Sequence, residues 1–270
     1  MAAPAGGRVR YAVHAEWTKL RTTRGPAWLL AATVAAVVAV GAASVASVDV
    51  SQCPAPTECH EDTTRLSLLG ARLGQATVVV LAVLAITNEH ATGMIRTTLA
   101  AVPRRHRVLW AKAVVVTVAV LAAGVLGVLG ALATGRAVLP GNGFTAANGY
   151  PPPSLTDGPT LRAAVGTVLY LVLVALLALG VGTVVRDTAG AVTTTLGLLY
   201  VVPLLVELVA DPQWHDRLER LAPMTAGLSV QATRDLDRLP IGPWAGLGVL
   251  AAYSATALLL GAVLLETRDP

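Results

Sequence analysis

Six long apolar runs, almost free of charged side chains, constrain this 270-residue sequence more than any other feature. Each run exceeds the roughly 18 residues that a helix needs to cross the hydrocarbon core of a bilayer. The runs are Ala27–Val48, Leu66–Thr87, Val108–Thr134, Leu161–Val185, Ala189–Val209 and Trp244–Leu265. They predict an all-α integral membrane protein with six transmembrane helices.

The composition excludes an ordinary soluble domain. Charged residues make up only 13% of the chain, against 54% apolar residues, whereas soluble globular proteins carry about 25% charged residues. The second run is the weakest, because it contains Arg72 and Gln75; we expect Arg72 to extend to the near interface. The first run is longer than the apolar part of a signal peptide, so we expect it to be retained rather than cleaved.

The charge distribution predicts an orientation. With the N-terminus inside, the internal segments hold twelve Lys and Arg residues and the external segments hold eight. Because an excess of Lys and Arg marks cytoplasmic segments, both termini are predicted to be cytoplasmic. The basic pI near 9.4 is therefore interpreted as a topology signal in a cell membrane, with the lipid bilayer as a partner and no nucleic acid.

Residues 1–26 precede the first run and are predicted to form an N-terminal tail with an interfacial helix, and residues 27–270 one six-helix domain. Val9, Val13, Trp17 and Leu20 form one helical stripe, as expected of a helix lying on the inner leaflet. Gly25–Pro26 is predicted to end this helix, with Pro26 opening the first span. The alternative is a basic tail that only sets the topology.

Residues 88–107 form the one substantial internal loop. Ile95, Thr98, Leu99 and Val102 follow the i, i+3, i+4, i+7 pattern of an amphipathic helix, which Pro103 would end. Such a helix is either another interface anchor or a docking helix for a cytoplasmic partner. Periodicity does not separate these two interpretations.

The external loops differ from one another. The first holds the only two cysteines, Cys53 and Cys59, and a disulfide between them is the simpler interpretation, since this side is oxidising. A metal site with His60 and neighbouring carboxylates is the weaker alternative, and no metal is predicted. The second loop, 135–160, is predicted to be irregular. In the third, Trp214, Leu218 and Leu221 predict a short surface helix.

The spans contain almost none of the side chains that membrane catalysis or proton coupling requires. No ionisable residue lies in the middle of any run, and Glu207, near an outer end, is interpreted as an interfacial carboxylate. No G-x-x-x-x-G-K-[ST] phosphate loop occurs in the sequence. No catalytic residues are predicted, and energy for active transport must come from another subunit.

Three stretches resemble the permease subunits of type-2 ABC exporters from high-GC Gram-positive bacteria. They are EWTKLRT at Glu16–Thr22, NEHATGMIRTTLAAVPRR at Asn88–Arg105, and LAPMTAG at Leu221–Gly227. The second stretch is the most specific. His90 departs from the family pattern, which more often has an aromatic residue such as tyrosine there.

This resemblance implies an N-terminal elbow helix and a short cytoplasmic coupling helix that docks onto a separate ATP-binding subunit, which would bind ATP and Mg²⁺; this chain would bind no cofactor. It also implies pairing of two permeases, as a homodimer or heterodimer. The implied elbow residues are Val13, Trp17, Lys19, Leu20 and Arg21. The implied coupling residues are Glu89, Thr92, Gly93, Met94, Ile95, Arg96, Leu99, Val102 and Arg104.

Two other functions stay open at this stage. The same internal helix would also suit a membrane-anchored regulatory or immunity-type protein without transport activity. A passive channel or secondary carrier is the third possibility, and it is the least compatible with spans that lack ionisable groups. Gly- and Ala-rich helices of this kind suit many different apolar cargoes.

Overall fold

The computed structural model describes residues 5–53, 55, 61–91 and 105–267. Within these ranges every regular element is a helix and no strand occurs. Six helical segments are long and apolar enough to cross a membrane, which confirms the predicted number of spans. They are α2 (Arg24–Ala46), α4 (Ala71–Ala91), α6 (Arg105–Val138), α7 (Gly158–Val185), the interrupted segment α8–η4–α9 (Thr188–Leu196, Gly197–Val201, Val202–Val206) and α12 (Pro243–Thr267).

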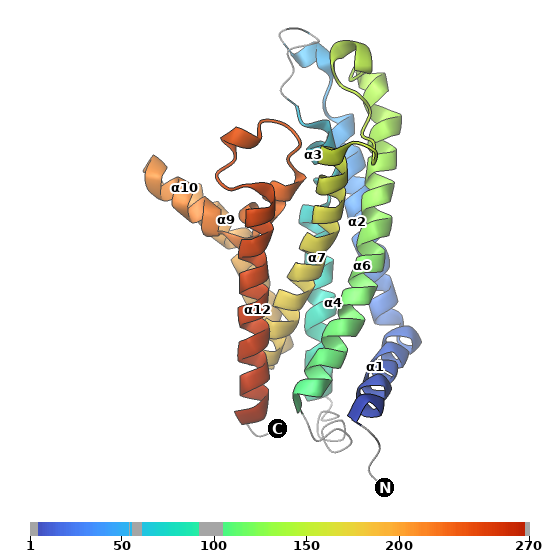
Figure 1. The fold of residues 1–270 in the computed structure, drawn as a ribbon, viewed down its shortest axis with the longest axis vertical. Helices are drawn as coiled ribbons and strands as arrows, with labels where there is room; N and C mark the ends of the chain where they lie inside the picture. The colour runs from blue at the N-terminus through green and yellow to red at the C-terminus, as the bar shows by residue number, and fades with distance from the viewer. Residues whose placement is uncertain (1–4, 54, 56–60, 92–104, 268–270) are drawn as a thin grey trace.

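Helix α7 lies at the centre of the bundle and packs against α12, α4 and α6 (Figure 1). Gly180 permits its closest approach to α12, since a Cβ atom there would lie 2.6 Å from the backbone carbon of Ala257. Helices α2 and α12 and the α8–α9 segment are more peripheral and expose apolar side chains such as Leu204 and Leu259. In a bilayer such faces meet lipid tails or another membrane chain.

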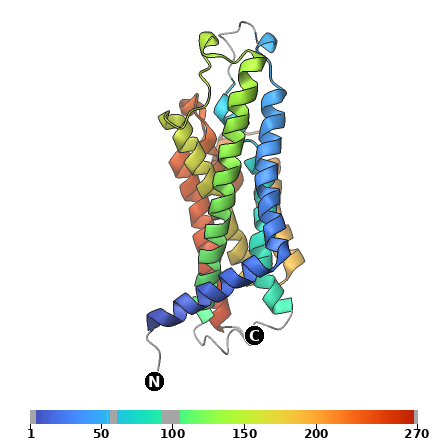
Figure 2. The same ribbon diagram turned by 90° about the vertical axis from the view of Figure 1, so that its right-hand side faces the viewer.

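The start of α1 and the end of α12 lie at the same end of the bundle, called here the N/C end (Figures 1 and 2). The opposite end, which carries the loops after α2 and α6, is called the loop end. Trp28 and Trp110 are exposed near the N/C end, and Trp244 is exposed at the start of α12. Tryptophan is enriched at both membrane–water interfaces, so these residues mark two levels compatible with the bilayer surfaces.

Helix α1 (Ala5–Thr22) lies across the N/C end, as Figure 2 shows. The predicted break at Gly25–Pro26 is wrong by two residues, because the chain turns at Thr23, whose backbone is extended (φ −98°, ψ 134°). Pro26 lies inside the first turn of α2, where its missing N–H costs no helical hydrogen bond. The two helices therefore meet at a corner of one residue.

The second predicted span begins too early. Short helix α3 (Thr63–Ser67) ends before a tight turn, and α4 starts at Ala71 rather than Leu66. Gly70 forms this turn against α2, where a Cβ atom would lie 2.1 Å from the Val37 carbonyl oxygen. Leu68 is fully buried, so this part of the apolar run packs inside the protein instead of crossing the membrane.

The fifth span is interrupted and shorter than predicted. A π-helical turn, η4, precedes Pro203, which has no N–H to donate to the preceding turn. Helix α9 ends at Val206, three residues before the predicted end. Glu207 follows as an exposed cap residue, and its position at the membrane interface stays a prediction.

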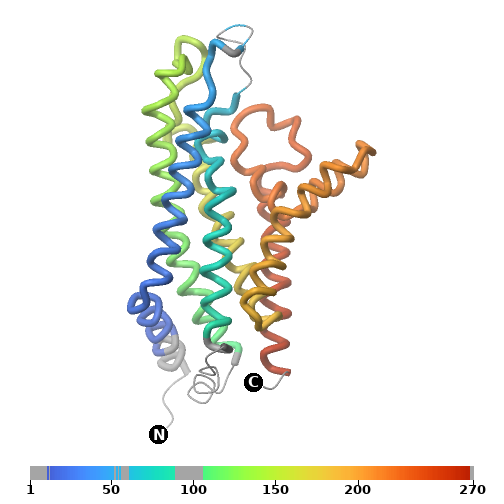
Figure 3. Tube along the Cα trace, turned by 180° about the vertical axis from the view of Figure 1, so that it is seen from behind, coloured from blue at the N-terminus to red at the C-terminus, as the bar shows by residue number. Residues whose placement is uncertain are grey.

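The loops predicted to be external are more ordered than their composition suggests. Short turns η1 (Val50–Gln52), η2 (Leu139–Asn142) and η3 (Ala146–Asn148) enclose a small apolar cluster, in which the rings of Phe144 and Tyr150 pack edge to face at 5.2 Å. The predicted surface helix is present as α10 (Pro212–Leu221), which points away from the bundle (Figure 3). Helix α11 (Pro223–Leu228), η5 (Ser229–Gln231) and η6 (Leu236–Arg238) lead into α12.

Candidate functional site

A buried ion pair joins α1 to the start of the third membrane helix, α6. The Nζ atom of Lys112 lies 2.8 Å from Oε2 of Glu16, and the exposed fractions of the two side chains are 2% and 11%. Removing either charge from water is costly, so a buried pair persists only with good geometry and additional hydrogen bonds. This site needs, and has, further partners.

Those partners come from α4 and from α1 itself. Lys112 donates a second hydrogen bond to the carbonyl oxygen of Ala85, at 2.9 Å, and the other carboxylate oxygen of Glu16 accepts from Lys19, also at 2.9 Å. We call Glu16, Lys19, Lys112 and the Ala85 carbonyl the lysine cluster. Through one ammonium group, the cluster connects α1, α4 and α6.

The choice of lysine at this site is unusual for the chain. Lys19 and Lys112 are its only two lysines among 20 basic residues, and both contact Glu16. An ammonium is compact and carries three rotatable donors, whereas the planar guanidinium of arginine needs more space and a fixed fork of acceptors. The lysine cluster therefore uses the smaller cation where three helices converge.

The predicted elbow residues lie on both sides of α1. Val13, Trp17 and Leu20 are half-buried, as expected for the inner stripe of the helix, while Arg21 is exposed. Lys19 is half-buried because it belongs to the lysine cluster. The position of α1 on a membrane surface stays a prediction.

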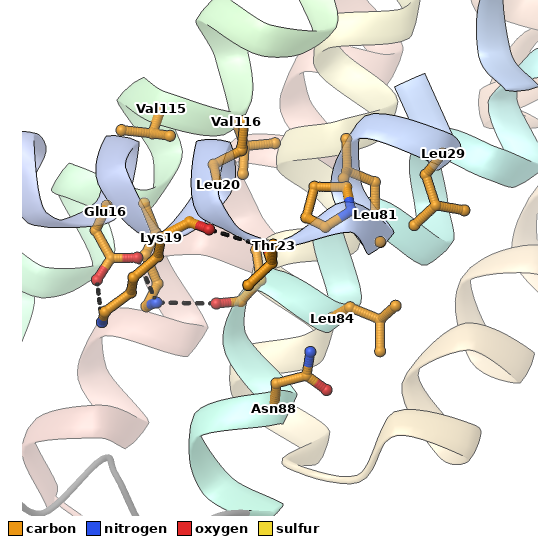
Figure 4. A pocket seen from close by; sticks show the side chains of 14 residues that line it. Glu16, Lys19, Leu20, Thr23, Leu29, Leu81, Leu84, Asn88, Val115 and Val116 are labelled. Carbon is orange, nitrogen blue, oxygen red and sulfur yellow. Dashed lines mark hydrogen bonds and ion pairs between the residues drawn. The ribbon is translucent and has the colours of Figure 1, made fainter. Parts of the chain in front are cut away.

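A cavity of about 390 Å³ opens beside the lysine cluster, in the corner between α1, α2, α4 and α6 (Figure 4). Glu16, Lys19, Lys112 and Asn88 supply polar lining, whereas most of the remaining lining is aliphatic. The aliphatic lining includes Leu20, Leu29, Leu81, Leu84, Val115 and Val116. An apolar chamber with a few charged groups along one side suits binding of an apolar or amphiphilic group.

The predicted coupling residues lie almost entirely outside the described part of the chain. Glu89 belongs to the last turns of α4, although its side chain is not described. The remaining eight, from Thr92 to Arg104, fall within residues 92–104, which the structure does not describe. The structure describes the two helices that flank this segment, α4 and α6. The lysine cluster connects them through hydrogen bonds of Lys112.

Sequence reasoning missed the lysine cluster. Lys112 was considered only as an internal charge that sets the topology, and Glu16 only as such a charge and as the start of the EWTKLRT stretch. The two residues lie 96 residues apart in the chain. One feature of the sequence could have indicated the cluster. Lys112 lies within an apolar run, and the only other lysine of the chain is Lys19. A lysine in such a run needs a partner, and Glu16 was one of five internal carboxylates that could supply it.

The predicted disulfide stays a prediction. Cys53 follows η1 and packs against the apolar cluster of the loop end, while Cys59 lies outside the described residues. Among the described residues, no group of three or more His, Cys, Asp or Glu side chains is close enough to hold a metal ion. Asp62, one of the carboxylates of the alternative metal site, caps α3 and accepts hydrogen bonds from Thr233.

Gln75, the polar residue that weakened the second predicted span, is fully buried and has partners inside the bundle. Its amide oxygen accepts a hydrogen bond from the Tyr170 hydroxyl, and its amide nitrogen donates to the Met224 sulfur at 3.1 Å. A buried amide with partners on both ends stabilises helix packing. We therefore assign Gln75 to the packing of α4 against α7 and α11.

Comparison with known proteins identifies the chain at the level of a family. The model of the ABC-2 family transporter protein matches residues 33–270, which includes all of the membrane helices except the first turns of α2. No match was found among curated proteins. The helical bundle, its six apolar spans and this family match agree, and the chain belongs to the ABC-2 family of transporter proteins.

Proposed function

We propose that this chain is the permease subunit of an ATP-driven exporter, working with a separate ATP-binding subunit. Its family consists of membrane components of ABC transporters, which are not themselves catalytic and in general work with an ATP-binding subunit. In this proposal the partner binds ATP and Mg²⁺, and two permeases, identical or related, form the path through the cell membrane.

The observation that carries the proposal is the position of the lysine cluster close to the end of α4 and the start of α6, the two helices that flank residues 92–104 in the chain. Ala85 lies within about two helical turns of the end of α4, and Lys112 within about two turns of the start of α6. The two helices that lead into and out of the proposed coupling segment are thus joined to each other and to α1. A displacement of the segment would move all three helices together.

The motion would then pass into the membrane through α2. Helix α1 is joined to α2 by a corner of one residue, Thr23, so a shift of α1 tilts or displaces the first span. The coupling residues Glu89, Ile95, Leu99 and Arg104 supply an apolar face and flanking charges for the partner. In this account the lysine cluster acts as a mechanical joint.

We place the N/C end in the cytoplasm. Lys and Arg residues are more numerous on that side, and short loops with this excess stay inside. Six spans return the chain to its starting side, in agreement with the common position of α1 and the end of α12 (Figure 1). Labelling of Cys53 and Cys59 from outside intact cells after reduction tests this orientation; labelling only after lysis would invert it.

Capture of the partner tests the coupling assignment. We expect the double variant Ile95→Asp with Leu99→Asp to lose capture of the co-expressed ATP-binding subunit, because two buried charges in a docking face disfavour the contact. Co-purification from detergent measures the loss.

A matched control changes the same residue types away from the partner. Leu218 and Leu221 are exposed on α10 at the loop end, so Leu218→Asp with Leu221→Asp adds the same charge without touching the coupling segment. Capture unchanged in the Ile95 and Leu99 variant would remove the coupling assignment. Loss of capture in both double variants would indicate general damage and would equally remove the support.

A further inference from the structure

The external arginines are unevenly distributed. External segments contain eleven carboxylates and only eight arginines, yet four of those arginines line a single cavity of about 400 Å³ at the loop end. They are Arg65 on α3, Arg72 on α4, and Arg234 and Arg238 in the segment before α12. Segments distant in the sequence thus bring four guanidinium groups to one place on an otherwise acidic side.

One of these arginines is held rigidly. The Arg234 side chain donates a hydrogen bond to the carbonyl oxygen of Gly149 at 2.9 Å, and its guanidinium lies 4.5 Å from the centre of the Tyr150 ring. Its backbone N–H donates to Asp62. Arg234 therefore forms a fixed wall of the cavity.

One of the three carboxylates in the cavity lining, Asp62, already has hydrogen-bond donors from the protein. Asp62 accepts hydrogen bonds from the backbone N–H groups of Arg65 and Arg234 and from the Thr233 hydroxyl, the last at 2.7 Å. The Asp62 carboxylate thus binds backbone N–H groups and a hydroxyl and, within the part of the chain that the structure describes, does not bind a guanidinium. Among the described residues, none of the four arginines of the cavity forms an ion pair with a carboxylate.

The cavity lies where a membrane surface is expected. Arg72 is the second residue of the membrane helix α4, and Trp244, exposed at the start of α12, marks the interface level on this side. Leu66, Leu69 and Leu239 also line the cavity. It therefore offers cationic groups together with apolar contacts at the depth of lipid headgroups.

We propose that this cavity binds a phosphate-type oxyanion, carried by an anionic lipid headgroup or free in solution. Guanidinium groups bind phosphate oxygens through paired, charge-assisted hydrogen bonds. The lining also contains Glu61, Asp62 and Asp235, so the four arginines leave one net positive charge. That balance matches one negative charge, as on a phosphodiester, better than a multiply charged anion. The proposal does not depend on the coupling segment or on the ATP-binding subunit.

Titration calorimetry on the purified chain in a neutral detergent tests the proposal. The probes are dihexanoyl-phosphatidylglycerol and inorganic phosphate. The double variant Arg65→Gln with Arg238→Gln removes two guanidiniums that form no ion pair within the described part of the chain, and we expect it to weaken binding by about ten-fold or more. The control is Arg217→Gln with Arg220→Gln on α10, which removes the same charge from the same side and is expected to change binding by about two-fold or less.

Three further measurements decide the outcome. Inorganic phosphate that displaces the lipid at comparable concentration identifies a free-anion site, whereas binding of the lipid alone identifies a headgroup site; both support the oxyanion. Arg65→Lys with Arg238→Lys, which retains the charge but loses the paired donors, is expected to bind with intermediate affinity, which distinguishes lost recognition from lost folding. Equal affinities for the Gln cavity variant and the α10 control, or no binding of either probe by the unmodified chain, would overturn the proposal.

Discussion

The two ends of the bundle differ in the surroundings of their positively charged side chains. At the N/C end, Lys112 is buried and bound to Glu16 and to the Ala85 carbonyl. At the loop end, Arg65, Arg72 and Arg238 line an open cavity and have no ion pair among the described residues. A charge whose partners are built into the protein fixes helices in place, whereas clustered charges without such partners favour an external anion.

The largest expected effect comes from breaking the buried pair on one side. In Glu16→Ala, Lys112 keeps its charge in a buried site and loses the Glu16 carboxylate, and we expect a loss of about 3–5 kcal/mol in the free energy of unfolding. Thermal unfolding in detergent, followed by the loss of the monodisperse peak, measures the change.

A matched double variant distinguishes the effect of the two charges from the effect of side-chain packing. Glu16→Gln with Lys112→Met removes both charges and keeps similar side-chain volumes, so it should be more stable than Glu16→Ala. If Glu16→Ala unfolds at the same temperature as the unmodified chain, the lysine cluster is not a structural joint, and the mechanical account of coupling loses its basis.

Hydropathy was sufficient to predict the six spans, but it erred where apolar residues are buried for another reason. Leu68 was included in a predicted span because it is apolar, yet it lies in a turn packed against α2. The amphipathic period of Trp214, Leu218 and Leu221 correctly predicted α10, because a short surface helix depends on local spacing alone. Local patterns were thus reliable for the elements and less so for their ends.

Neither charged site was predictable from local patterns. Glu16 meets Lys112 across 96 residues, and Arg65 and Arg238 come together only when the segment before α12 folds back over α3. Such pairings depend on tertiary packing, which periodicity does not encode. The predicted coupling residues between Thr92 and Arg104 stay predictions, since they lie outside the described residues.

An exchange of cation type is the next test of the comparison. Lys112→Arg keeps the charge but places a larger, planar group in a site that is only 2% exposed, so we expect a loss of about 1–3 kcal/mol through overpacking. The same exchange in reverse at the loop end, Arg65→Lys, should leave stability within about 0.5 kcal/mol, since that side chain is exposed. Equal effects at the two ends would contradict the distinction between a packed joint and an open site.

The smallest expected effect concerns stability at the loop end. The side chains of Arg65 and Arg238 are exposed, so Arg65→Gln with Arg238→Gln should change the free energy of unfolding by about 0.5 kcal/mol or less per residue in the absence of an anion. Relief of repulsion among the remaining arginines can even make the change slightly favourable. Thermal unfolding with and without dihexanoyl-phosphatidylglycerol is the measurement, because a ligand stabilises only the protein that binds it. The unmodified chain should gain more stability from the lipid than the variant does; a large loss of stability without lipid would mean that these arginines hold the fold together.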